Sequence, residues 1–420
     1  MKISTNEFLL GTLNDMLSQQ QNVNTLNREI ATGQTLLDAS TDPAGASNVL
    51  RTANAISQYN YDLSNATAAT ASLQNGVAAL QQVTTLLTSL RQTAVQAADV
   101  TTSPANRQSL IQTAQSALTQ LIQLANTRGP NGQYLFGGSN GGTVPYSSQP
   151  NGQVIFNGDG AANRIEIAPS LSVPSSISGS GIFTNIPAGD NGISASALGA
   201  NSGSGTAVAQ GVTNIGQLAA GRLANTQYEI SFAAGPNNSL TYTVTSGTGA
   251  PGSAGFAATS GIVSTGGFAS GSDLAFGGVD IRIDGTPAAG DKFDVQTGAT
   301  TSMFQTVQNL VAALQAQSSS PAGNAQFQQA IGNVVADLDG AQTSALSAQA
   351  SLGASLNEIA AVQGQDTGLN ANAQAQLADL QSANLPQVMA NYSESLTALQ
   401  ASQLAFAKVQ GLSLFNYIHP

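Results

Sequence analysis

The start of the chain carries apolar side chains three, four or seven positions apart, as on one face of a helix. The residues on this face are Leu9, Leu13, Met16, Val23, Leu26 and Ile30. The segment STDPAGAS follows, in which Asp42 can cap a helix and Pro43 can occupy its first position. We therefore predict one helix through Ile30 and a second that begins at Pro43.

The second helix has a much longer pattern. Its apolar and small residues keep a 3,4 spacing across five heptads, which is typical of a coiled-coil seam, and only Arg91 interrupts them at an inner position. The seam consists of Ile56, Tyr59, Leu63, Ala66, Thr70, Leu73, Val77, Leu80, Thr84, Leu87 and Ala94. Ser103 and Pro104 repeat the capping arrangement and predict a further helix, after which RGPNGQYLFGG indicates a turn and a strand.

The last part of the chain mirrors the first. One seam, with 3,4 spacing, consists of Ile331, Val335, Leu338, Gln342, Ala345, Gln349, Leu352, Leu356 and Ile359. Glycine and asparagine at 364–372 predict an interruption, and the seam then continues with Leu385, Met389, Tyr392, Leu396, Leu399, Gln403 and Phe406. The flanks of these seams are short of charge pairs, so their specificity must come from packing and neutral hydrogen bonds.

The middle of the chain, residues 143–300, is rich in Gly, Ser and Thr and contains short runs that alternate between apolar and polar residues. Tyr228, Ile230 and Phe232 can pair with Leu240, Tyr242 and Val244 across AGPNNS, which is a hairpin pattern. Val279, Ile281 and Ile283 alternate in the same way. These runs predict an antiparallel β domain, and partial disorder is the alternative interpretation of so much glycine and serine.

The sequence thus predicts an α+β protein, in which both termini form a long helical coiled-coil bundle and an antiparallel β domain is inserted between them. We expect a terminal coiled-coil core of residues 1–42 and 375–420 and a helical rod of residues 43–142 and 301–374. The inserted β domain is expected at 143–300.

The composition of the chain limits the classes of partner that we expect it to bind. The 11 basic residues are scattered and the net charge is -11, so neither nucleic acid nor a membrane is an expected partner. The chain has no cysteine, which excludes disulfides and thiolate metal sites. The first residues lack the continuous apolar run of a cleaved secretory signal, and no stretch approaches the ~18 apolar residues of a membrane span.

Candidate catalytic chemistry is sparse. The single histidine, His419, is next to last, and a histidine there is more typical of an exposed chain end than of a catalyst. Asp159, in NGDGAANRIEI, suggests a calcium loop only faintly and fits a β-turn better. Asp337 and Asp339 lie beside a seam position and are expected on a solvated face. We predict no catalytic, cofactor or metal site, and no enzyme activity.

The two termini are the informative feature, because each carries an apolar stripe. Burial of the two stripes against each other does not offset the backbone entropy of ordering about eighty residues, so the helices need additional surface from other subunits. We therefore predict an assembly interface on the termini. It comprises the first stripe, Leu9, Leu13, Met16, Val23, Leu26 and Ile30, and the C-terminal residues Met389, Tyr392, Leu396, Leu399, Phe406, Leu412, Leu414, Phe415 and Tyr417.

Several segments carry a family resemblance. TLNREIATGQTLLDASTDPAGASNVL and NGQYLFGGS near the start, GVDIRIDGTPAAGDKFDVQ in the middle, and SLGASLNEIAAVQ and LTALQASQLAFAKVQGLSLFNYI near the end resemble the flagellin superfamily, and within it the hook-filament junction proteins. The resemblance covers about half the chain, in the family's order, and LSLFNYI is its most specific segment.

The resemblance implies a structural junction protein of the bacterial flagellum. Such a protein is exported largely unfolded by the flagellar type III apparatus with the help of an export chaperone, and the absence of cysteine suits that passage. It then assembles outside the cell as a ring of its own copies between hook-associated protein 1 and the flagellin filament. The alternatives are a filament-forming flagellin and a fibre-like surface adhesin with a helical stalk, which would be a stable trimer.

Overall fold

The computed structural model describes residues 2–35, 42–99, 103–236, 239–249, 256–318 and 320–415. The chain divides into two compact units, a terminal unit of residues 1–64 and 362–420 and a central unit of residues 65–361. Helices α2 (Pro43–Ala97) and α6 (Pro321–Gln381) run through both. The α+β class, with terminal helices and a central antiparallel region, is confirmed. The three-part division at 42, 142, 300 and 374 stays a prediction.

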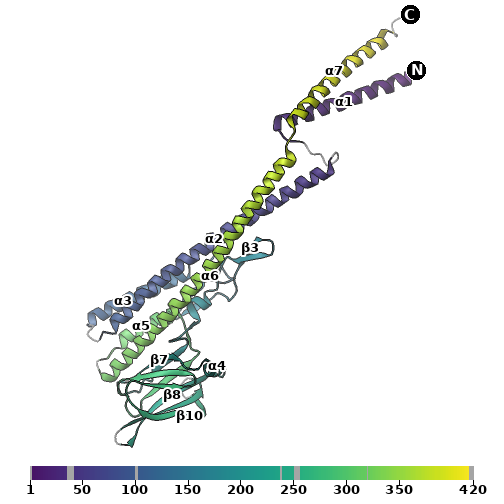
Figure 1. Cartoon of the computed structure of the whole chain (residues 1–420). Helices are drawn as coiled ribbons and strands as arrows, with labels where there is room; N and C mark the ends of the chain where they lie inside the picture. The colour runs from purple at the N-terminus through teal and green to yellow at the C-terminus, as the bar shows by residue number, and fades with distance from the viewer. Residues whose placement is uncertain are drawn as a thin grey trace. The chain divides into compact units, whose positions relative to one another are not determined.

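The central unit contains a bundle of long helices, in which α2 and α6 run alongside each other (Figure 1). The predicted α2 seam is partly buried: Leu73, Leu80 and Leu87 are at most 3% exposed, whereas Thr70, Val77 and Thr84 are half-buried. A neutral hydrogen bond from Gln349 Nε2 to Thr84 Oγ1, 3.1 Å long, joins the two helices, as the lack of charge pairs in the seam predicts.

Arg91 does not take the inner position that the heptad count gave it. Its side chain is 46% exposed and its Nε donates to Asp339 Oδ1 at 2.8 Å. Leu90 and Ala94 are buried on either side of it. The guanidinium is therefore solvated at the edge of the seam and paired with a carboxylate of α6, which spares the cost of burying its charge.

The helix starts that the sequence indicates are confirmed. At the start of α2, Gly45 N donates to Asp42 Oδ1 at 2.9 Å, with Pro43 as the first helical residue. Helix α3 (Pro104–Ala125) begins in the same way, where Asn106 N donates to Ser103 Oγ at 3.2 Å. These short polar side chains satisfy backbone N–H groups that have no partner inside the helix.

The interruption expected at 364–372 is wrong, because α6 continues to Gln381. Isolated glycines such as Gly364 and Gly368 cost only about 1 kcal/mol each in a helix, which is too little to end a helix of this length. The break lies at 382–384 instead, and α7 (Leu385–Phe415) begins after it.

The strand expected in RGPNGQYLFGG is also wrong. This segment is a series of turns with single β-bridges, from Arg128 to Tyr134 and from Gly137 to Ser178. Its apolar side chains fill a core instead of extending a sheet: the Phe136 ring meets Phe183 edge-on, with centroids 5.2 Å apart. Tyr146 and Phe304 complete the same aromatic cluster, and burial raises the pKa of the Tyr146 hydroxyl.

Short elements follow this cluster up to residue 187. The hairpins are β1 (Tyr146–Ser148) with β2 (Val154–Phe156), and β3 (Arg164–Ala168) with β4 (Leu171–Pro174). A π-helical turn, η1 (Ser180–Thr184), precedes β5 (Ile186–Pro187), which pairs with β14 (Thr300–Thr301) next to α5 (Met303–Ala316).

The larger β region is a two-sheet sandwich with strand orders β10-β9-β8-β13-β6 and β11-β12-β7. Its strands are β6 (Ile193–Ala197), β7 (Thr206–Val212), β8 (Thr226–Ala234), β9 (Leu240–Thr248), β10 (Ala257–Phe268), β11 (Ser272–Phe276), β12 (Val279–Asp284) and β13 (Lys292–Thr297), and α4 (Ile215–Leu223) lies between β7 and β8 in the chain. The predicted hairpin is confirmed, with Ile230 opposite Val244 and Phe232 opposite Tyr242. Side chains from both sheets share one core.

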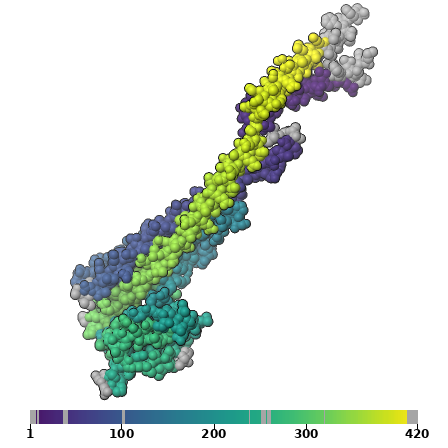
Figure 2. All heavy atoms as spheres, viewed as in Figure 1, coloured from purple at the N-terminus to yellow at the C-terminus, as the bar shows by residue number. Residues whose placement is uncertain are grey.

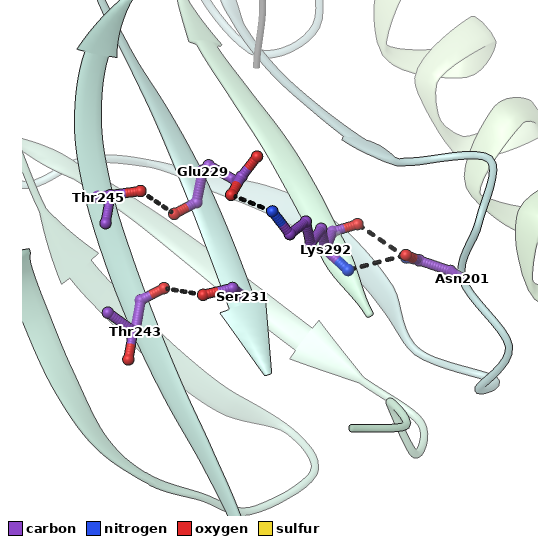
Figure 3. A network of polar contacts seen from close by, with 6 residues as sticks. All are labelled: Asn201, Glu229, Ser231, Thr243, Thr245 and Lys292. Carbon is purple, nitrogen blue, oxygen red and sulfur yellow. Dashed lines mark hydrogen bonds and ion pairs between the residues drawn. The ribbon is translucent and has the colours of Figure 1, made fainter. Parts of the chain in front are cut away.

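The face of β8 and β13 that points away from this core is polar (Figure 3). Lys292 Nζ lies 2.9 Å from Glu229 Oε1 across the two strands. Asn201 forms two hydrogen bonds with the backbone of Lys292. Its Oδ1 accepts from the N–H of Lys292 and its Nδ2 donates to the C=O of Lys292, both at 2.8 Å. Ser231 Oγ donates to the C=O of Thr243.

Candidate functional site in the terminal helices

The predicted assembly residues lie on α1 (Lys2–Thr32) and α7 (Leu385–Phe415), which pack along each other within the terminal unit (Figures 1 and 2). Gly33, with a φ of +69°, ends α1 in the left-handed conformation that glycine adopts readily. The chain beyond it pairs with the connection between α6 and α7: Thr35 N donates to Gln381 O at 2.7 Å and Ala383 N to Gly33 O at 3.0 Å. The two helices therefore run antiparallel from this connection.

Most of the predicted residues that the structure describes are half-buried in this pair. They are Met16, Val23, Leu26 and Ile30 on α1, and Tyr392, Leu396, Leu399 and Phe406 on α7. Leu13 and Met389 are exposed, at 42% and 58%. The side chains of Leu9, Leu412, Leu414 and Phe415, and Tyr417 as a whole, lie outside the described residues.

The pair leaves a second apolar stripe uncovered. Leu10, Leu13 and Leu17 follow one another at spacings of three and four, and Leu10 and Leu17 are 56% and 51% exposed. Leu404 on α7 is 66% exposed. Among the described side chains of the two helices, only Val388 is buried. Two helices in contact cannot cover apolar surface on more than one side, so each has a face available to a further partner.

One hydrogen bond between α1 and α7 is weak. Gln19 Nε2 donates to Ser395 O at 3.4 Å, a long hydrogen bond.

A buried polar layer between α2 and α6, also in the terminal unit, was missed by sequence reasoning. Asp62 and Asp366 are 1% and 5% exposed, and Oδ2 of each has no hydrogen-bond partner. Gln58 Nε2 donates to Asp62 Oδ1 at 2.9 Å, and Asn370 Nδ2 donates to Asn60 Oδ1 at 2.7 Å. Burial, and secondarily the Asp62 carboxylate, raise the pKa of Asp366.

A signal for this layer exists in the sequence. Asp62 lies three residues after Tyr59 and four before Ala66, and both of these belong to the predicted seam. The spacing places Asp62 on the buried face, although the apolar pattern alone selects its neighbour Leu63.

The remaining candidate residues have structural roles. Asp337 is buried, not solvated as expected, and its Oδ1 accepts a hydrogen bond from Gly189 N at 2.7 Å, so the carboxylate anchors the chain after β5 to α6. Asp339 is exposed and pairs with Arg91. Asp159 closes a turn by accepting from Ser139 N and Ala161 N. His419 lies outside the described residues.

Neither a metal site nor a membrane span is found in the described parts of the chain. No group of three or more His, Asp or Glu side chains there could hold a metal ion. No helix in these residues has the length and apolarity needed to cross a bilayer.

Comparison with known proteins finds similarity to flagellar proteins. The model of the bacterial flagellin N-terminal helical region matches residues 3–141, which contain α1, α2 and α3. In these N-terminal helices the chain is similar to the flagellin superfamily. The solved flagellar junction protein FlgL of Legionella pneumophila is 26% identical, with a TM-score of 0.68 over 80% of this chain and 99% of that one.

Two curated members of the superfamily are also similar. Flagellar hook-associated protein 3 of Escherichia coli is 26% identical over 171 residues, which are 41% of this chain and 54% of that protein. B-type flagellin of Pseudomonas aeruginosa is 29% identical over 143 residues, which are 34% of this chain and 29% of that protein. The chain therefore spans about half, or less, of the length of the curated relatives it matches.

Proposed function

We propose that this protein is a structural component of the bacterial flagellum that joins the hook to the filament. The observation that carries the proposal is the match to the FlgL junction protein, because that similarity extends over 99% of the solved chain and includes helices and β region alike. The hook-associated protein 3 match supports the same role. The role requires no catalysis, so we infer a structural protein and not an enzyme.

The terminal helices would form the assembly interface. Apart from Val388, no described side chain of α1 or α7 is buried, and the stripe of Leu10, Leu13 and Leu17 has no cover within the terminal unit. In our proposal, α1 and α7 of neighbouring copies cover these stripes in a ring. The partners on either side of the ring would be hook-associated protein 1 and flagellin.

The route out of the cell follows from the same proposal. The chain would pass unfolded through the flagellar type III apparatus with an export chaperone bound. A chain without cysteine cannot be trapped by disulfides during that passage. A pair of terminal helices with so little buried surface would also unfold at small cost.

A filament-forming flagellin is the second candidate, and the match to B-type flagellin supports it. That match spans 29% of the flagellin, whereas the FlgL match extends over nearly the whole solved chain. The N-terminal helical region is common to both kinds of protein, so it does not separate them. The junction proposal is favoured because it accounts for the β region as well.

The two candidates differ in the phenotype of a deletion. Loss of a junction protein should leave hooks without filaments, visible by electron microscopy, and should release flagellin into the medium. Loss of the flagellin itself would also remove filaments, but no flagellin would appear outside the cell. Normal filaments after deletion would overturn the proposal, and restoration by the intact gene is the control.

A further inference from the structure

The β sandwich is connected to the rest of the central unit by a two-stranded ribbon. The chain enters the sandwich after β5 and leaves it before β14, and these two connections pair with each other. Ala188 N donates to Ala299 O at 2.9 Å, and Gly298 N donates to Gly192 O at 2.7 Å. An isolated two-stranded ribbon is only marginally stable, so it does not by itself fix the direction in which the sandwich points.

The hydrophobic core of the sandwich does not fix this direction either. The core consists of side chains from the two sheets and α4, and none of the described side chains in it belongs to α6. A pocket of about 130 Å³ remains between α6 and the sandwich, and its walls include Gly332, Ala336 and Val208. Atoms that line such a pocket lack close neighbours on one side, so apolar packing holds α6 and the sandwich together only weakly.

Polar side chains on one face of α6 make the contact instead. Gln329, Asn333 and Asp337 are four residues apart, so they lie on successive turns of the helix. Gln329 Nε2 donates to Ala195 O of β6 at 3.0 Å and to Ala207 O of β7 at 2.6 Å, while its Oε1 accepts from Ala207 N at 2.5 Å. Asn333 Nδ2 donates to Ala195 O at 2.9 Å.

Asp337 extends this row of hydrogen bonds to the ribbon. Its Oδ1 accepts from Gly189 N at 2.7 Å, where the chain passes from β5 into the sandwich. Gln329 and Asp337 are 5% and 7% exposed, so little water reaches these side chains. One face of α6 therefore binds the backbone of three segments, which are the ribbon, β6 and β7. Hydrogen bonds are directional, so rotation of the sandwich about the ribbon would break those to β6 and β7.

We propose that Gln329, Asn333 and Asp337 are positioning residues that hold the β sandwich in one direction relative to α6. Without their hydrogen bonds, the sandwich stays folded and swings on the ribbon. A single hydrogen bond of ordinary net strength changes the ratio of attached to swinging molecules by about fivefold, and these side chains supply several. The proposal concerns the isolated chain and does not depend on the flagellar function.

The test is the distance between two spin labels, measured by pulsed electron paramagnetic resonance on the full-length chain. The chain has no cysteine, so Ser89→Cys on α2 and Ala275→Cys on β11 place the labels at two exposed positions. We expect a narrow distance distribution in this labelled chain. Adding Gln329→Ala and Asn333→Ala together should make it at least about twice as wide, since the sandwich then samples several directions. The matched control is Asn357→Ala, which removes an exposed amide from α6 and should leave the distribution narrow.

Two substitutions at Asp337 distinguish a lost hydrogen bond from damage to the fold. Asp337→Asn keeps an Oδ1 that can accept from Gly189 N, so the distribution should stay narrow, whereas Asp337→Ala should widen it. The near-ultraviolet circular dichroism of Tyr228, in the sandwich core, should be the same in all variants.

Three results would overturn the proposal. One is a distribution that is already wide in the labelled chain without further substitutions. Another is a distribution that stays narrow in the double variant, because the ribbon or apolar packing would then set the direction of the sandwich. The third is widening together with loss of the Tyr228 signal, because unfolding of the sandwich would then explain it. Equal widths in the two Asp337 variants would overturn the role of Asp337.

Discussion

Asp294 should make the β sandwich less stable at neutral pH than at acid pH. Its side chain is 6% exposed, lies opposite Glu229 in the β8–β13 pairing and accepts a hydrogen bond from Gln296 on Oδ2, while Oδ1 has no partner. Burial raises the pKa of Asp294 from 3.8 to about 6. The hydrogen bond from Gln296 opposes this increase in part, and the Glu229 carboxylate adds to it.

The sign of the effect follows from the direction of this change. A carboxyl with a raised pKa in the folded state binds a proton more tightly there than in the unfolded chain, so it opposes folding once it is ionised. Its stabilising contribution is present below pH 3.8 and is lost as the pH rises towards 6. Each pKa unit corresponds to about 1.4 kcal/mol, so the loss is about 3 kcal/mol above pH 6.

The substitution Asp294→Asn should therefore stabilise the protein near neutral pH. The asparagine Oδ1 can keep the Gln296 hydrogen bond, and its Nδ2 replaces an oxygen that accepts no hydrogen bond in the described structure. We expect a gain of up to about 3 kcal/mol in the free energy of unfolding at about pH 7.5, which falls below about 1 kcal/mol near pH 4.

Urea unfolding of the full-length chain, followed by near-ultraviolet circular dichroism of tyrosine, measures this difference across the pH range. Tyr228, in the sandwich core and in contact with Phe276, is a suitable reporter. The matched control is Asp284→Asn, since Asp284 is an exposed carboxylate on β12. If the Asp294 variant were equally or less stable at pH 7.5, or if its gain did not depend on pH, the reasoning from burial would be refuted.

Three further changes test other parts of the structure. Asp366→Asn should increase the thermal stability of the terminal helices at neutral pH and should change it less in acid, because the raised pKa of Asp366 makes its ionised form unfavourable in the folded state. Thermal unfolding followed by helical circular dichroism at several pH values tests this, and a loss of stability at neutral pH would contradict it. Gln329→Leu should cost about 1 to 3 kcal/mol for each backbone group that it leaves unpaired, measured by urea unfolding, and an unchanged stability would mean that water replaces the amide. Phe406→Ser should abolish the joining of filament to hook while changing the melting temperature of the isolated protein little; a large drop would mean that α7 is stabilised mainly by its own chain.

Local patterns predicted most of the elements. The caps at Asp42 and Ser103 and the Ile230–Val244 pairing follow from residues that are close in sequence, and each is confirmed. Gly364 and Gly368 do not interrupt α6, since two isolated glycines cost a long helix little. Other predictions were wrong where contacts between residues far apart in the sequence determine the structure. Asp337 is buried because Gly189, far away in the sequence, supplies its hydrogen bond.

The candidate site could be predicted only in part for the same reason. The spacing of Met16, Val23 and Leu26 predicted a common face of α1, and all three side chains are half-buried, whereas their part in assembly stays a prediction. The acidic layer of Asp62 and Asp366 could not be read from apolar periodicity, because both residues are polar and their proximity depends on the alignment of α2 with α6. Leu10 and Leu17, which flank the predicted Leu13 on the exposed side, were overlooked because one helix face had already been assigned.

The same 3,4 spacing has different consequences in the two units, and the number of neighbours explains the difference. In the central unit, Leu80 and Leu87 are almost fully buried, because a helix bundle surrounds them. In the terminal unit, α1 packs along α7, and Leu10 and Leu17 stay more than half exposed. A helix with apolar residues on two sides needs at least two neighbours to bury them. α7 occupies one side of α1, and in the proposed ring an adjacent copy would supply the second neighbour.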